Sequence, residues 1–200
     1  MSAPLDAGSP WAELWSLDPA VDYLNHGSFG ACPRAVLSYQ SELRVQLERE
    51  PVDFMARRLE GLLRSAREAL GGFVGAEPGD LAFVSNATSG VNAVLRSRAF
   101  AADDELLTTD HAYNACKNAL EFVARTYGAR VVIAPLPFPV ASPDDVVAAV
   151  MAHVTPRTRL ALLDHITSPT ALILPIERLI AELASRGIDT LIDGAHAPGM

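Results

Sequence analysis

The sequence predicts an α/β fold with a mostly parallel sheet, preceded by an N-terminal helical arm. From residue 81 onwards, short apolar runs alternate with longer segments of helical periodicity. The apolar runs are nearly continuous, which is typical of parallel strands that helices cover on both faces. Half of the 200 residues are hydrophobic, so a buried core of this kind is feasible.

The helical arm is expected over residues 1–75, after an irregular start that is rich in proline and glycine. Pro33 stands at the beginning of a helix, and residues 33–50 have helical spacing. Pro51 interrupts this helix. A second helix is predicted over residues 53–75, with Asp53 as its N-cap.

Residues 76–200 are expected to form the sheet domain. Apolar runs predict its strands at 81–85, 105–110, 130–135, 159–165 and 188–193. The helices between them are predicted at 88–100, 113–128, 142–154 and 175–187. Ser142 is the expected N-cap of the third of these helices, and Gly128 is expected to end the second.

Composition narrows the class of protein. The net charge of −8 argues against a nucleic-acid partner, because phosphates would be repelled. No apolar run has the length of a membrane span, and residues 1–15 lack the basic and apolar regions of a signal peptide. Two cysteines do not make a disulfide framework. We therefore expect a cytoplasmic protein without a membrane partner.

Polar residues follow four of the predicted strands. In open α/β sheets, ligands bind outside the carboxyl ends of the strands, so these groups are expected to converge on one edge. The four segments are "SNATSG" (85–90), "DHAYNAC" (110–116), "DHITSPT" (164–170) and "DGAHAPG" (193–199).

Each signal has more than one interpretation. The "SNATSG" turn suits a phosphate at a helix N-terminus but is also typical of a simple helix cap. Asp193 either caps the next turn or accepts a hydrogen bond from a bound cation. A metal site is disfavoured because the sequence has no HxxxH or HxH pair, and a serine hydrolase is disfavoured because it has no GxSxG elbow.

Five motifs together resemble the pyridoxal-phosphate (PLP) enzymes of fold type I, in the class V aminotransferase family and its isopenicillin N epimerase-like branch. They occur in the family's order and roughly its spacing, and the resemblance covers the chain from about residue 20 onwards. The motifs are "YLNHGSFG" (23–30), "SNATSGVN" (85–92), "TTDHAYNAC" (108–116), "HITSPTALILP" (165–175) and "DGAHAPG" (193–199). The resemblance implies a three-layer large domain, PLP as cofactor, an amino-acid substrate and a homodimer.

The resemblance also implies roles for single residues around the cofactor. Asp193 would pair with the pyridinium nitrogen, so that the ring acts as an electron sink. His111 would stack on the ring, with Tyr113 as a second aromatic contact, and His196 would bond the phenolic oxygen. The phosphate would be held by Asn86, Ala87 and Thr88.

Other residues are assigned by position in the same motifs. Thr167 and Ser168 stand where many relatives carry an asparagine near the phenolic oxygen, which is a departure from the family pattern. Asn25 and His26 resemble a segment that folds over the substrate. Arg57 or Arg58 is expected to meet a substrate carboxylate.

In this family the cofactor forms a Schiff base with a lysine that lies beyond the "DGAHAPG" strand. Lys117 is the only lysine here, and it falls within a predicted helix as a solvated residue. We therefore expect the C-terminal part of the enzyme to be absent and the 200 residues alone to be inactive.

Several reactions share this part of the site. Epimerisation (or racemisation) and C–S lysis are favoured, with cysteine desulfurase, selenocysteine lyase-like or aminotransferase chemistry as alternatives. An alternative of another class is a half-length, non-catalytic protein that binds a phosphate ligand.

Overall fold

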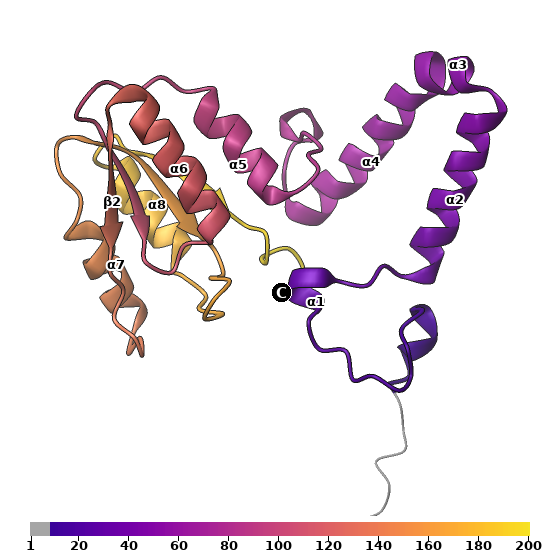
Figure 1. The fold of residues 1–200 in the computed structure, drawn as a ribbon, viewed down its shortest axis with the longest axis horizontal. Helices are drawn as coiled ribbons and strands as arrows, with labels where there is room; N and C mark the ends of the chain where they lie inside the picture. Colours follow the sequence, from indigo (N-terminus) through magenta and orange to yellow (C-terminus); the bar gives the residue numbers. More distant parts are fainter. Residues whose placement is uncertain (1–8) are drawn as a thin grey trace, which may run out of the picture. The chain divides into compact units, whose positions relative to one another are not determined.

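The computed structural model describes residues 9–200 and shows two compact units (Figure 1). The first unit ends at Ala82, and the second comprises Phe83–Met200. Among the described residues, no helix combines the length and the apolar character that a bilayer crossing requires.

The first unit is helical, as the sequence predicts. Its main helices are α2 and a long segment in which α3, the π-helical turn η2 and α4 follow one another without a break. Gly75 ends α4 in the left-handed conformation (φ 72°). The elements are η1 (Ala12–Leu14), α1 (His26–Phe29), α2 (Arg34–Arg49), α3 (Pro51–Asp53), η2 (Phe54–Arg58), α4 (Leu59–Val74) and η3 (Pro78–Asp80).

The prediction that Asp53 is the N-cap of the second helix is wrong. The helix begins two residues earlier, at Pro51. Proline suits the first helical position because its φ is fixed near the helical value and its missing N–H is not needed there. Asp53 therefore lies inside the first turn, where its carboxylate accepts a hydrogen bond from Arg57 at 3.2 Å.

The second unit has a four-stranded parallel sheet in the order β2-β1-β3-β4. The chain moves outwards from β1 to β2, crosses back over β1 to β3, and continues to β4. Ligands in such sheets bind at the carboxyl edge where the direction reverses, which here lies between β1 and β3. The strands are β1 (Glu105–Thr109), β2 (Arg130–Ala134), β3 (Thr158–Asp164) and β4 (Asp189–Asp193).

Helices cover both faces of the sheet, which confirms the three-layer α/β architecture (Figure 1). On one face, α5 and α6 pack against Leu106, Leu160 and Leu162. On the other face, α7 and α8 pack against Leu107, Ala161 and Leu163. The helices are α5 (Ala87–Arg96), α6 (Asn114–Tyr127), α7 (Pro143–Met151) and α8 (Ile176–Ala184).

Two helix ends in the second unit follow the predicted signals. Ser142 caps α7 and forms a reciprocal capping box with Asp145. Gly128, with φ 73°, ends α6 in the left-handed conformation. Lys117 lies in α6, as predicted, but is half-buried.

The predicted strand at residues 81–85 does not form. Residues 81–84 have no regular secondary structure, and Phe83 and Val84 are about half exposed, at 51% and 52%. A strand needs a neighbour to accept and donate its backbone hydrogen bonds, and no described strand pairs with this segment.

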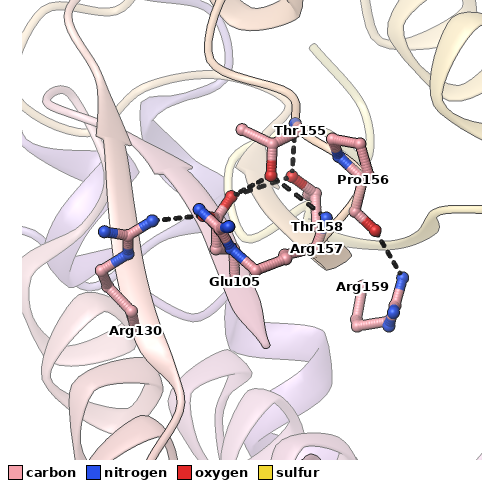
Figure 2. Close-up of polar contacts among 7 residues, drawn as sticks. All are labelled: Glu105, Arg130, Thr155, Pro156, Arg157, Thr158 and Arg159. Carbon is pink, nitrogen blue, oxygen red and sulfur yellow. Dashed lines mark hydrogen bonds and ion pairs between the residues drawn. The ribbon is translucent and has the colours of Figure 1, made fainter. Parts of the chain in front are cut away.

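A buried carboxylate is held at the amino end of the sheet (Figure 2). Glu105, the first residue of β1, is fully buried and accepts hydrogen bonds from Arg130, Arg157 and Thr155. Burial acts to raise the pKa of Glu105, but these donors outweigh it and lower the pKa to about 2. This cluster ties β1 to the start of β2 and to the loop before β3.

Candidate functional site

Two strand-terminal aspartates lie side by side at the carboxyl edge of the sheet. Asp164 ends β3, Asp193 ends β4, and the two are in register. In-register residues of parallel strands share a face, and Leu162 places this face against α5 and α6. Both side chains are buried, with exposed fractions of 2% for Asp164 and 6% for Asp193.

Asp193 receives hydrogen bonds on both carboxylate oxygens. The backbone N–H of Ala195 donates to Oδ1 at 3.1 Å, and the thiol of Cys116, in α6, donates to Oδ2 at 3.1 Å. Burial and the neighbouring Asp193 carboxylate raise the pKa of Cys116 to about 12, against a smaller opposing effect of the Thr88 hydroxyl. The thiol is therefore a hydrogen-bond donor to Asp193, and not a nucleophile.

Asp164 is a site residue that the sequence prediction missed. Its Oδ2 accepts a hydrogen bond from the backbone N–H of Tyr113 at 3.1 Å, whereas its buried Oδ1 has no partner among the described residues. Burial and the charge of Asp193 raise the pKa of Asp164 to about 6. The available signal was its place at the end of an apolar strand, the same place that singled out Asp193.

Asn86, predicted as a phosphate contact, lies at the N-terminus of α5. Asn86 is the N-cap, and its Oδ1 accepts a hydrogen bond from the backbone N–H of Ser89 at 2.8 Å. A hollow of about 380 Å³ lies between this helix and the end of β4. Its lining includes both Ala87 and Asp193, so two of the predicted cofactor contacts lie in one hollow; the lining residues are Ala87, Gly90, Val91, Leu191, Ile192, Asp193, Gly194, Ala195 and Pro198.

His111 follows β1 and is held by a chain of hydroxyl groups. Its Nδ1 is 2.8 Å from Oγ1 of Thr170, which is 2.8 Å from Oγ1 of Thr167. Thr167 in turn accepts a hydrogen bond from the backbone N–H of Leu172 at 2.9 Å. The ring of His111 is 8% exposed and lies 5.8 Å from the ring of Phe138. Two of the predicted site residues, His111 and Thr167, are therefore connected through Thr170.

Three predicted residues of the second unit are less constrained. Tyr113 precedes α6, and its ring is 45% exposed. Ser168 is exposed and His196 is half-buried. Within residues 9–200, the side chains of Ser168 and His196 make no hydrogen bond, and no group of three His, Cys, Asp or Glu side chains converges as metal ligands would.

The four predicted substrate residues lie in the first unit. Asn25 precedes α1 and His26 begins it, with the His26 ring in edge contact with Tyr23. Arg57 and Arg58 belong to η2. Arg57 pairs with Asp53, and Arg58 bonds Gln46 and lies over the ring of Phe54.

Comparison with known proteins agrees with this architecture. The sequence matches the family described as Aminotransferase class-V over residues 31–199. It is 45% identical to isopenicillin N epimerase of Amycolatopsis lactamdurans, covering 94% of this chain and 49% of that protein. It is 34% identical to putative L-cysteine desulfhydrase 1 of Oryza sativa subsp. japonica, covering 94% of this chain and 42% of that protein.

Solved structures share the fold. The cystine C-S lyase C-DES, in a complex with cysteine persulfide, superposes with a TM-score of 0.79 at 24% identity, over 88% of this chain and 48% of that one. The cysteine desulfurase CsdA from Escherichia coli gives a TM-score of 0.75 at 24% identity, over 92% of this chain and 49% of that one. The chain spans about half the length of the curated relatives it matches. The family match over most of the chain, together with the three-layer fold, shows that the chain belongs to the aminotransferase class-V family.

Proposed function

We propose that this chain is the N-terminal part of a pyridoxal-phosphate enzyme that acts at the α carbon of an amino acid or its derivative. Epimerase chemistry is our first choice, because the isopenicillin N epimerases are 41–45% identical to the chain. The L-cysteine desulfhydrases are 29–34% identical, so C–S lyase chemistry is the second choice. The observation that carries the proposal is the buried carboxylate of Asp193 in the hollow beside α5.

The residues present fit this cofactor. When bound, PLP supplies an electron sink for negative charge that develops at the α carbon. Asp193 provides the anion that a protonated pyridine nitrogen needs, and two hydrogen bonds hold this anion in place. The first N–H groups of α5, at Ala87 and Thr88, suit a phosphate dianion at the positive end of the helix.

Two further side chains shape the same site. The hydroxyl chain through Thr170 fixes the orientation of His111, so its ring can stack on an aromatic cofactor. Of the two cysteines, Cys116 is unsuited to the nucleophile of a desulfurase, because it is fully buried and its pKa is raised to about 12. Cys116 therefore does not supply the nucleophile of a desulfurase.

Substitution of Asp193 by asparagine, in the full-length protein that contains this chain, tests the proposal. Asp193→Asn keeps the shape of the side chain but removes its charge, so PLP affinity should fall by about 10- to 100-fold, as expected for loss of a hydrogen bond to a charged group. Asp189→Asn is the matched control, since Asp189 lies on the same strand but is exposed and pairs with Arg98. PLP binding is measured by absorbance titration of the apoprotein.

The outcomes separate the possible functions. Equal PLP affinity in the two variants would refute the role of Asp193. Binding of inorganic phosphate without binding of PLP would favour a non-catalytic phosphate-binding protein. With L-cysteine, sulfide release indicates lyase chemistry, whereas uptake of deuterium at the α carbon of an intact amino acid indicates epimerase chemistry.

We also propose that the full-length protein is a cytoplasmic homodimer without a nucleic-acid partner. Large apolar side chains of the helical arm are exposed, among them Leu24, Phe29 and Val45, and such surfaces are typical of protein interfaces. The net charge of −8 supports the absence of nucleic-acid binding. Light scattering of the purified protein tests the dimer, and cell fractionation tests the location.

A further inference from the structure

The paired carboxyl groups of Asp164 and Asp193 have unequal surroundings. Asp193 accepts one hydrogen bond on each oxygen, from Ala195 and from Cys116. Asp164 accepts only one, from Tyr113, and its Oδ1 is buried with no partner among the described residues. An ionised oxygen without a donor is costly in a buried site, whereas a protonated oxygen avoids much of this cost.

The two groups cannot titrate independently. They lie at the ends of neighbouring parallel strands, in register and on one face, and strands are about 5 Å apart. Two adjacent carboxylates repel each other, so the first proton goes to the member that is less well stabilised as an anion. The hydrogen-bond difference makes Asp164 that member.

The groups around the pair do not reverse this order. From α6, Cys116 faces Asp193, and its thiol remains protonated and neutral. After β1, Asp110 is exposed, accepts a hydrogen bond from the backbone N–H of Leu136, and lies 3.9 Å from Nε2 of His111, whose Nδ1 bonds Thr170. Among the described residues, no ionisable side chain forms a hydrogen bond or an ion pair with Asp164.

We propose that Asp164 is a positioning residue that takes up the first proton bound by this carboxyl pair. The protonation itself is a property of the apoprotein. The consequence of this protonation for the ligand rests on the proposed function. While Asp164 is protonated, Asp193 remains able to pair with a pyridinium nitrogen. Asp164 adds a second negative charge beside Asp193 only when it ionises, at about pH 6.

Infrared spectroscopy of the apoprotein tests the protonation. The carbonyl stretch of a protonated carboxyl group should grow in as pH falls through about 6, and it should be lost in Asp164→Asn. In Asp193→Asn the band should remain, but its midpoint should move to lower pH because the repelling charge is gone. Asp189→Asn, the exposed control, should leave the midpoint unchanged. Asp164→Asn keeps an acceptor for the Tyr113 N–H, so folding should be retained.

A band that persists in Asp164→Asn and vanishes in Asp193→Asn would overturn the proposal, as would the absence of any such band in the wild-type protein. The pH dependence of PLP affinity tests the consequence. The wild-type affinity, relative to that of Asp164→Asn, should rise by roughly tenfold as pH increases through about 6, because a second negative charge then lies beside Asp193. If PLP binds neither protein while the infrared titration is as expected, the proposed function fails and the protonation order stands.

Discussion

The Glu105 cluster at the amino end of the sheet gives a quantitative prediction for stability (Figure 2). Glu105 is buried, and donors from Thr155, Arg130 and Arg157 overcome the effect of burial and lower the pKa of its carboxyl group from 4.5 to about 2. A shift of this size corresponds to about 3 kcal/mol of free energy of unfolding. Because the side chains of Arg130 and Arg157 are 61% and 57% exposed, solvent screening reduces this to about 1–2 kcal/mol.

The variant that tests this is Glu105→Gln, which keeps the size and one acceptor of the side chain. Since the pKa is lowered in the folded state, the stabilisation is fully present above pH 4.5 and is lost as pH falls through about 2. Urea unfolding should show a deficit of about 1–2 kcal/mol at neutral pH, and this deficit should shrink as the solution becomes more acidic than the ordinary pKa.

A matched control separates the buried carboxylate from an ordinary surface pair. Glu121→Gln removes the partner of Arg125, in an exposed pair one helical turn apart in α6 at 4.0 Å, and should cost no more than about 0.5 kcal/mol. The reasoning is refuted if Glu105→Gln costs as little as Glu121→Gln. It is also refuted if the deficit of Glu105→Gln is the same at acid and neutral pH.

Three further predictions follow from packing and hydrogen bonding. Gly71→Ala would place a Cβ 2.6 Å from the backbone carbonyl oxygen of Ala76 and should lower the free energy of unfolding by about 1–3 kcal/mol. Gly72→Ala meets open space and should raise it by about 0.5–1 kcal/mol. Hydrogen exchange in α4 compares the two variants. Ser142→Ala removes the cap of α7 and should lower the free energy of unfolding by about 0.5–2 kcal/mol in urea titrations. Thr170→Val leaves Nδ1 of His111 without its partner and should cost about 1–3 kcal/mol in the same titrations, while Thr170→Ser should restore most of the loss.

Much of the second unit could be predicted from the sequence because its signals are local and agree with one another. Four apolar runs, with capped helices between them, predict a layered parallel sheet, and the structure confirms it. Ser142 and Gly128 act at the helix ends where the sequence placed them. The edge at which the polar motifs meet also follows from the fold class, because parallel strands share one carboxyl edge.

The errors arise where a local pattern depends on a distant partner. Residues 81–85 have the composition of a strand, but a strand exists only beside another strand, and composition does not reveal which neighbour is available. At the start of the second helix, an aspartate and a proline both carried N-terminal signals. The helix begins at Pro51, because the fixed φ of proline suits the first helical position. Asp53 therefore lies inside the first turn.

Asp164 was missed for a different reason. In the segment "DHITSPT" the family resemblance implies roles only for Thr167 and Ser168, so Asp164 has no predicted role. In a parallel sheet, the last residues of neighbouring strands lie in register, so Asp164 and Asp193 meet although 29 positions separate them in the sequence. A strand-terminal aspartate therefore carries more information when the neighbouring strand also ends in one, because two adjacent buried carboxyl groups cannot titrate independently.

The difference in hydrogen bonding between Asp164 and Asp193 decides which of the two carboxylates stays ionised in the pair. Asp193 has donors on both oxygens, so its charge is compensated before any ligand arrives. Asp164 has one donor and an unpartnered oxygen, so its charge is the one that protonation removes. The neutral Cys116 thiol contributes to this difference because it hydrogen-bonds Asp193 alone. When the pair holds one proton, the remaining negative charge is therefore on Asp193. Two equally hydrogen-bonded carboxyl groups would instead share that charge between them.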